Sequence, residues 1–212
     1  MIPSSELAGL VLSGGRGSRL QSLAVHEPVE KGLVCIHGRP LVAHACAYLA
    51  PWVSCTLISA NRHLDRYAAY GRVVTDDPAL GADQGPLAGL ASALAVAPLP
   101  WVLVVPVDSL ALPADLPVRL WQAAQQAGAR LAYARSGADD HPLCALVHRD
   151  LAGSVYSQVA QGQRRVRSWF QSQGAAVAVY PDGQDRFLNV NTPQALAEAN
   201  GQAPHQAQAA GA

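Results

Sequence analysis

The chain has 212 residues, enough to bury one substantial hydrophobic core but too few for two large domains. Half of the residues are hydrophobic and only 14% are charged, which fits a sheet that is buried on both faces. The formal net charge is zero, so no overall field favours nucleic acid or an anionic membrane. We therefore expect neither nucleic acid nor a membrane as a partner.

Short apolar runs alternate along the chain with amphipathic stretches, the pattern of strands joined by crossover helices. The apolar runs predict strands at Ala8–Ser13, Ser54–Ser59, Arg72–Thr75, Trp101–Val107, Arg130–Ala134 and Ala175–Tyr180. The amphipathic stretches predict helices at Pro40–Leu49, Pro86–Val96, Ala114–Ala127, Leu151–Ala160, Arg165–Gln171 and Pro193–Asn200. The expected fold is a three-layer α/β sandwich, in which helices cover both faces of a Rossmann-like, mostly parallel sheet.

One domain over residues 1–200 accounts for all of these elements. Residues 201–212 are rich in Ala, Gln and Gly and have no apolar periodicity, so we expect a disordered tail. The longest apolar run, residues 101–107, is too short to span a bilayer, and the N-terminus lacks the pattern of a secretion signal. The expected location is the cytoplasm.

A glycine-rich loop follows the first predicted strand and reads Leu12-Ser13-Gly14-Gly15-Arg16-Gly17-Ser18-Arg19-Leu20. Such a loop offers unhindered backbone N–H groups to phosphate oxygens. Lys31, the only lysine beside fourteen arginines, follows it and adds a compact point charge, which indicates a nucleotide phosphate site. An arginine-rich composition by itself also accounts for a single lysine. The loop fits neither the P-loop nor the GxGxxG pattern, but its place after a strand of an α/β sheet favours ligand binding.

Asp108 ends the apolar run that begins at Trp101. A carboxylate there would lie at the carboxyl edge of a central strand, close to the glycine loop, where it can hold Mg²⁺ that bridges phosphates. The alternative is an exposed acid that caps the next turn, a role that Ser109 can equally fill.

Two further segments carry polar groups that suit a ligand. Asp76 follows a predicted strand, and Gly85-Pro86 begin a helix whose first N–H groups can bind an anionic substrate. Asn189 and Asn191 stand at alternate positions and share one face if the chain is extended, so their amides can read polar ring edges. The alternatives are an ordinary loop for the first segment and turn or cap formers for the second.

Taken together, these motifs resemble the molybdenum cofactor guanylyltransferases, within the wider class of nucleotidyltransferases that use an LxGGxxxR loop. Nearly the whole chain takes part. The matching residues are Leu12-Ser13-Gly14-Gly15 with Arg19, Lys31-Gly32-Leu33, Gly38-Arg39-Pro40-Leu41, Ala60-Asn61-Arg62-His63, Asp76, Gly85-Pro86-Leu87-Ala88-Gly89, Asp108, His141-Pro142, Gly162-Gln163-Arg164-Arg165-Val166 and Asn189-Val190-Asn191-Thr192-Pro193. The resemblance implies a fold of the nucleotide-diphospho-sugar transferase type.

The resemblance also implies an activity: transfer of GMP from GTP to the phosphate of molybdopterin that carries molybdenum, with loss of pyrophosphate and a requirement for Mg²⁺. The residues implied to bind the nucleotide are Leu12, Ser13, Gly14, Gly15, Lys31, Ser59, Asp76 and Asp108. Lys31, Arg19 and Asp108 are the implied catalytic residues, with Asp108 as metal ligand. The implied pterin side comprises Gly85, Pro86, Asn189 and Asn191. Proteins that deliver molybdopterin or mature molybdoenzymes are the further partners to expect.

The chain departs from the family pattern in the segment between Gly15 and Lys31, which is several residues longer than usual and ends in Glu30-Lys31 where Asp-Lys is typical. Ser59 replaces an asparagine, and Val107 replaces a cysteine. Two alternatives to guanylyl transfer stay open. The chain is a nucleotidyltransferase for another phosphorylated substrate, either a sugar phosphate or molybdopterin with CTP, or it is a non-catalytic cofactor carrier.

Overall fold

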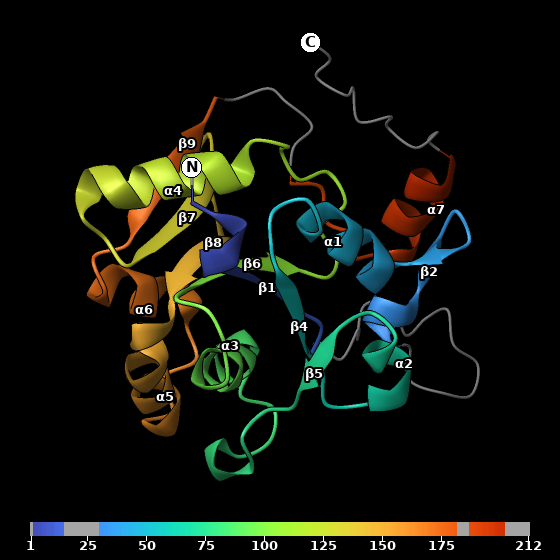
Figure 1. Ribbon diagram of the computed structural model, residues 1–212. Helices are drawn as coiled ribbons and strands as arrows, with labels where there is room; N and C mark the ends of the chain where they lie inside the picture. Colours follow the sequence, from blue (N-terminus) through green and yellow to red (C-terminus); the bar gives the residue numbers. More distant parts are fainter. Residues whose placement is uncertain (1, 15–29, 182–186, 202–212) are drawn as a thin grey trace.

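The fold is described from a computed structural model over residues 2–14, 30–181 and 187–201. Within these residues the main sheet has seven strands in the order β5-β4-β1-β6-β8-β7-β9 (Figure 1). Its strands are β1 Leu7–Leu12, β4 Cys55–Ser59, β5 Arg72–Val74, β6 Trp101–Pro106, β7 Leu131–Ser136, β8 Asp139–His148 and β9 Ala176–Tyr180. A separate small pair is formed by β2 Cys35–Ile36 and β3 Arg39–Pro40.

The sheet is mostly parallel, as the alternation of strands and helices predicts. β5, β4, β1 and β6 pair in parallel, and β9 is parallel to β7. β8 runs antiparallel to both of its neighbours, β6 and β7. The α/β fold class is therefore confirmed, with one reversed strand in the interior of the sheet.

Helices cover both faces of the sheet (Figure 1). They are α1 Leu41–Leu49, α2 Leu64–Ala68, α3 Pro86–Ala95, α4 Leu116–Ala127, α5 Ala152–Ala160, α6 Val166–Ser172 and α7 Pro193–Gly201. Side chains of a strand alternate between faces, so Val11 joins one core with α1 and α4, while Leu10 joins a second core with α3, α5 and α6. Two buried cores, one on each side, produce the three layers.

Each predicted strand and helix is present, and its ends lie within two residues of the prediction. Thr192 caps α7, because the Ala195 N–H donates to its Oγ1 at 3.1 Å. β8 was not predicted, since its first half reads Asp-Asp-His-Pro and hides the apolar half that follows. The short elements α2, β2 and β3 were not predicted either.

In the described ranges 2–14, 30–181 and 187–201, no helix has the length and hydrophobicity needed to cross a lipid bilayer. Gly201, the first residue of the predicted tail, is the last residue of α7. Residues 202–212 lie outside the described part of the chain, so the disordered tail stays a prediction.

Candidate active site

The carboxyl ends of β4, β1 and β6 meet at one edge of the sheet. Leu12 at the end of β1 pairs in register with Ser59 at the end of β4. The pairing continues beyond the strands, where the Ser13 N–H donates to the Ser59 carbonyl at 2.9 Å and the Val107 N–H donates to the Leu12 carbonyl at 3.1 Å. The start of the glycine loop and Asp108 are therefore fixed side by side, as their places at the carboxyl ends of strands predict.

A pocket opens at this edge, between the strand ends, the turn that carries Lys31 and the first turn of α3. The predicted site residues that line it are Leu12, Gly14, Lys31, Ser59, Asp76, Gly85, Pro86 and Asp108. Ser13 is buried, Asn191 accepts a hydrogen bond from Lys31 in the pocket wall, and Asn189 accepts one from Ser109, the residue after Asp108. Gly15 and Arg19 lie outside the described residues, so their roles stay predictions.

Lys31 lies at the centre of the polar contacts in this pocket. Its Nζ donates to Asp108 Oδ2 at 2.5 Å and also donates to Asn191 Oδ1. The Lys31 and Asp108 side chains are only 13% and 17% exposed, so solvent screens their attraction less than it would on an open surface. The fold thus brings together three polar side chains that are up to 160 residues apart in the sequence.

The segment from Phe187 to Asn191 runs beside the loop that follows β6. The Val190 N–H donates to the Asp108 carbonyl at 2.9 Å, and the Ser109 hydroxyl donates to Asn189 Oδ1 at 2.6 Å. These bonds place both predicted asparagines next to the Asp108 loop. Asn189 bonds Ser109, whereas the other asparagine bonds Lys31.

Asp76, just beyond the end of β5, is paired with a residue that sequence reasoning did not place among the site residues. Asn61 donates from Nδ2 to Asp76 Oδ2 at 2.9 Å, and the Asp76 N–H donates back to Asn61 Oδ1 at 2.8 Å. Burial raises the pKa of the Asp76 carboxyl, and the Asn61 hydrogen bond partly offsets this increase. Asn61 lies two residues after β4, so the same strand-end reasoning that selected Asp76 could have found it.

The first turn of α3 forms another wall of the pocket. Gly85 precedes this turn at φ +77°, a backbone conformation that favours glycine, and Pro86 is its first residue. The N–H groups of a helix N-terminus favour anions. A Cβ on Gly89 would collide with Ser59 Oγ, so α3 approaches the end of β4 very closely.

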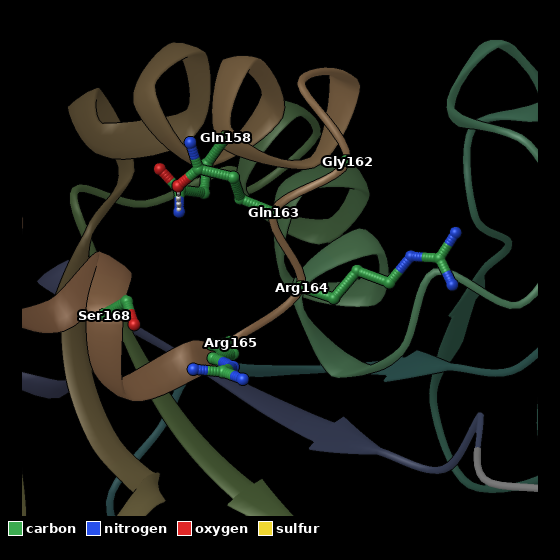
Figure 2. Close-up of a pocket in the computed structure, with 6 residues that line it drawn as sticks. All are labelled: Gln158, Gly162, Gln163, Arg164, Arg165 and Ser168. Carbon is green, nitrogen blue, oxygen red and sulfur yellow. Dashed lines mark hydrogen bonds between the residues drawn. The ribbon is translucent and has the colours of Figure 1, made fainter.

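The Gly162–Val166 motif lies at a different depression, between α5 and α6 (Figure 2). Its walls are Gln158, Gly162, Gln163, Arg164, Arg165 and Ser168. Gln158 Nε2 donates to Gln163 Oε1 at 2.7 Å, and the Arg164 side chain extends away from the other residues drawn (Figure 2). None of these six described residues lines the pocket at the sheet edge.

The oxygen donors at the pocket suit a metal ion that the protein and the substrate phosphates bind together. Within residues 2–14, 30–181 and 187–201, no group of three or more His, Cys, Asp or Glu side chains could hold a metal ion. Mg²⁺ is commonly bound through one or two carboxylates together with substrate phosphates, and its preferred ligands are oxygens. The Asp108 carboxylate fits such an arrangement as the protein's contribution.

A family model described as "MobA-like NTP transferase domain" matches residues 9–177. The chain belongs to this family. A Burkholderia lata protein named molybdenum cofactor guanylyltransferase is 39% identical over 205 residues, which span 92% of this chain and 95% of that protein. The recognition drawn from the sequence motifs is thereby confirmed, and the protein is a nucleotidyltransferase.

Solved structures confirm the fold of this MobA-like transferase. Molybdopterin-guanine dinucleotide biosynthesis protein A of Archaeoglobus fulgidus has a TM-score of 0.69 at 20% identity, with 92% of this chain and 97% of that chain covered. Rv0371c of Mycobacterium tuberculosis, in a complex with manganese, has a TM-score of 0.64 at 14% identity, with 93% and 100% covered.

The contact between α3 and β4 can be tested with Gly89→Ala. We expect the free energy of unfolding to fall by about 1–3 kcal/mol, because the added methyl overlaps Ser59 Oγ. Urea unfolding measures the change. Gly153→Ala in α5 is the matched control, since its added Cβ meets no atom within 4 Å and alanine favours a helix. Ser59→Ala should restore part of the loss, and unaltered stability of Gly89→Ala would contradict the close contact.

Proposed function

We propose that this MobA-like transferase moves GMP from GTP to molybdopterin that carries molybdenum, forming molybdopterin guanine dinucleotide cofactor and pyrophosphate. The observation that carries the proposal is the convergence of Lys31, Asp108 and Asn191 beside Gly14 and the start of α3. This arrangement offers a cation, a metal-binding carboxylate and an amide to two phosphorylated substrates at once. The name of the Burkholderia lata relative, which matches along nearly the whole chain, supports the same reaction.

The guanine end of GTP is assigned to the pocket wall formed by Asp76, Asn61 and Ser59. Guanine presents the N1–H and N2–H donors on its base-pairing edge, whereas cytosine presents N3 and O2 acceptors beside a single amino donor. A carboxylate accepts hydrogen bonds and cannot donate them when ionised, so Asp76 suits guanine better. Asn61 keeps this carboxylate in place through its two hydrogen bonds.

The phosphate end is assigned to Gly14, Lys31 and Asp108, with Gly15 and Arg19 as predicted contributors. A phosphate oxygen of molybdopterin attacks the α-phosphorus of GTP, and the bond from this phosphorus to the bridging oxygen of the β-phosphate breaks. Pyrophosphate leaves with the bonding electron pair. The protein's task is to align two anions and offset their repulsion. Lys31 stands where its ammonium group can meet both sets of phosphates, and Mg²⁺ bound at Asp108 would neutralise the charge that develops on the leaving group.

The acceptor is assigned to the side of the pocket that Gly85, Pro86, Asn189 and Asn191 form or adjoin. The positive end of α3 suits the terminal phosphate of molybdopterin, and side-chain amides suit the donors and acceptors of a pterin ring. We also propose a cytoplasmic reaction, fed by a protein that delivers molybdopterin and followed by a protein that transfers the product to molybdoenzymes.

Nucleotide selection provides a direct test. We expect GTP with Mg²⁺ to raise the melting temperature far more than CTP, ATP or UTP. A nucleotide that binds the folded protein stabilises it, and the assigned contacts favour guanine. At a hundredfold excess over Kd the gain is about 2.7 kcal/mol. Asp76→Asn should reduce the effect of GTP selectively, since the amide offers a donor where guanine also donates.

Each other outcome selects another function. A shift specific to CTP would favour the cytidylyl alternative. A shift with GTP, together with turnover that requires a sugar phosphate and not the pterin as acceptor, would favour sugar-nucleotide synthesis. Absence of a shift with every nucleotide would favour the non-catalytic carrier.

The role of Asp108 is tested with Asp108→Asn, which keeps the shape of the side chain and removes its charge. We expect turnover to fall about a hundredfold or more, because the amide binds a divalent cation poorly and leaves Lys31 without its counter-charge. The assay is pyrophosphate release with GTP, Mg²⁺ and molybdenum-bearing molybdopterin. Asp150→Asn is the control. Asp150 follows the end of β8 that pairs with the start of β6, whereas the pocket lies at the other end of β6. Wild-type turnover by Asp108→Asn would remove the metal assignment.

A further inference from the structure

We propose that the Tyr67 hydroxyl is a positioning group for the transfer reaction. With Ser13, Glu30 and Arg62 it forms a hydrogen-bonded cluster, here called the Tyr67 anchor, that fixes the backbone on either side of Lys31. The anchor thereby directs the Lys31 ammonium group to Asp108. This inference rests on the proposed function and adds to it a group that lies outside the pocket.

The anchor is a continuous chain of hydrogen bonds across three segments. The Ser13 hydroxyl, just beyond β1, donates to the Tyr67 hydroxyl oxygen at 2.6 Å. The Tyr67 hydroxyl, on α2, donates to Glu30 Oε1 at 2.9 Å. Arg62 donates from Nε and Nη2 to Glu30 Oε2 at 3.1 Å and 3.0 Å. The residue directly before Lys31 is therefore tied to the end of the central strand through the tyrosine.

Burial makes these bonds costly to break. Tyr67 is completely buried, Ser13 is 1% exposed and the Glu30 side chain is 8% exposed. Burial also raises the pKa of Tyr67, so its hydroxyl stays protonated and keeps its donor. A buried polar group that loses its partner incurs a desolvation penalty. The Tyr67 hydroxyl thus bonds two partners from separate segments, Ser13 and Glu30, at a buried position.

The backbone on the other side of Lys31 packs directly on the anchor. A Cβ on Gly32 would collide with both Ser13 Oγ and the Tyr67 hydroxyl oxygen. The Leu33 N–H also donates to the Glu30 carbonyl at 3.0 Å, which closes the turn that carries Lys31. The residues on either side of Lys31 are thus held by the anchor, Glu30 through hydrogen bonds and Gly32 through close packing.

Holding both neighbours matters because lysine has a long stem with many rotamers. Ordering these rotamers costs side-chain entropy, and a shift of the backbone at residue 31 changes which rotamers reach Asp108. A misplacement of about 1 Å at a reacting group can cost about a hundredfold in rate. Removing the Tyr67 hydroxyl is therefore expected to act on the reaction through Lys31, although the hydroxyl itself does not line the pocket.

Tyr67→Phe tests this idea because it removes a single oxygen and leaves the ring in the core. We expect kcat/KM for GMP transfer to fall about tenfold in the wild-type background. In the Lys31→Ala background the same change should reduce kcat/KM less than about twofold, since the group through which it acts is already gone. A purely structural role would instead lower both backgrounds by the same factor and would overturn the proposal.

Tyr48→Phe is the matched control. Tyr48 also loses a hydroxyl hydrogen bond on substitution, in this case to the Pro113 carbonyl at 2.7 Å, away from the pocket. It should lower the melting temperature without changing kcat/KM in either background. A comparable loss of kcat/KM in Tyr48→Phe would show that the rate follows stability and not the position of Lys31.

The chain also permits a measurement that needs no turnover, because Lys31 is its only lysine. Reductive methylation with ¹³C-formaldehyde and cyanoborohydride, read by mass spectrometry on the Lys31 peptide, reports the reactivity of one lysine amino group. Lys31 should react slowly in the wild type and several times faster in Tyr67→Phe, with Tyr48→Phe unchanged. Equal rates in the wild type and Tyr67→Phe would overturn the anchor. A faster rate in Tyr67→Phe together with a wild type that transfers no GMP would support the anchor and reject only the proposed function.

Discussion

The parallel pairing of β1 with β4 and β6 is the constraint on which the rest of the site depends. It forces three strands to end at the same level, and the hydrogen bonds of Ser13 and Val107 extend the pairing into the following loops. The segments that follow these strands therefore begin side by side at one edge of the sheet. The two cores on opposite faces hold the sheet in this register, since slipping a strand by one residue would exchange its buried faces.

Much of this framework could be predicted from the sequence, because a doubly covered sheet leaves continuous apolar runs and its helices leave a helical period. Strand β8 could not be predicted because the first half of its sequence is polar and includes Pro142. Its pairing with both neighbours, β6 and β7, leaves no pattern along its own sequence. Helix α2 could not be predicted because its five residues are too few to show a helical period. These omissions hid Leu143 on β8, which lines the pocket, and Tyr67 on α2.

The candidate site could be predicted to a similar degree. Gly14, Asp76 and Asp108 each lie two residues beyond a strand, so the strand-end rule indicated them as candidates, and the family resemblance gave them their roles. The bond between Lys31 and Asn191 could not be predicted in the same way, because it depends on how residues 187–191 return to the sheet edge. Asn61 and Asp76 likewise meet only because β4 and β5 are neighbours, which no pattern along one strand records.

The ion pair between Lys31 and Asp108 cannot by itself determine where the lysine points during a reaction. A carboxylate that takes up a divalent cation has less charge to offer its lysine, and incoming phosphates compete for the same ammonium group. A lysine oriented only by that carboxylate would lose its direction when both substrates are present. Glu30 bonds the buried Tyr67 hydroxyl and the more exposed Arg62, and Gly32 packs on Ser13 and Tyr67. None of these contacted groups lines the pocket, so binding at the pocket leaves the contacts in place. The contacts that orient the backbone of Lys31, through Glu30 and Gly32, are therefore different from the ion pair with Asp108 that changes when substrates bind.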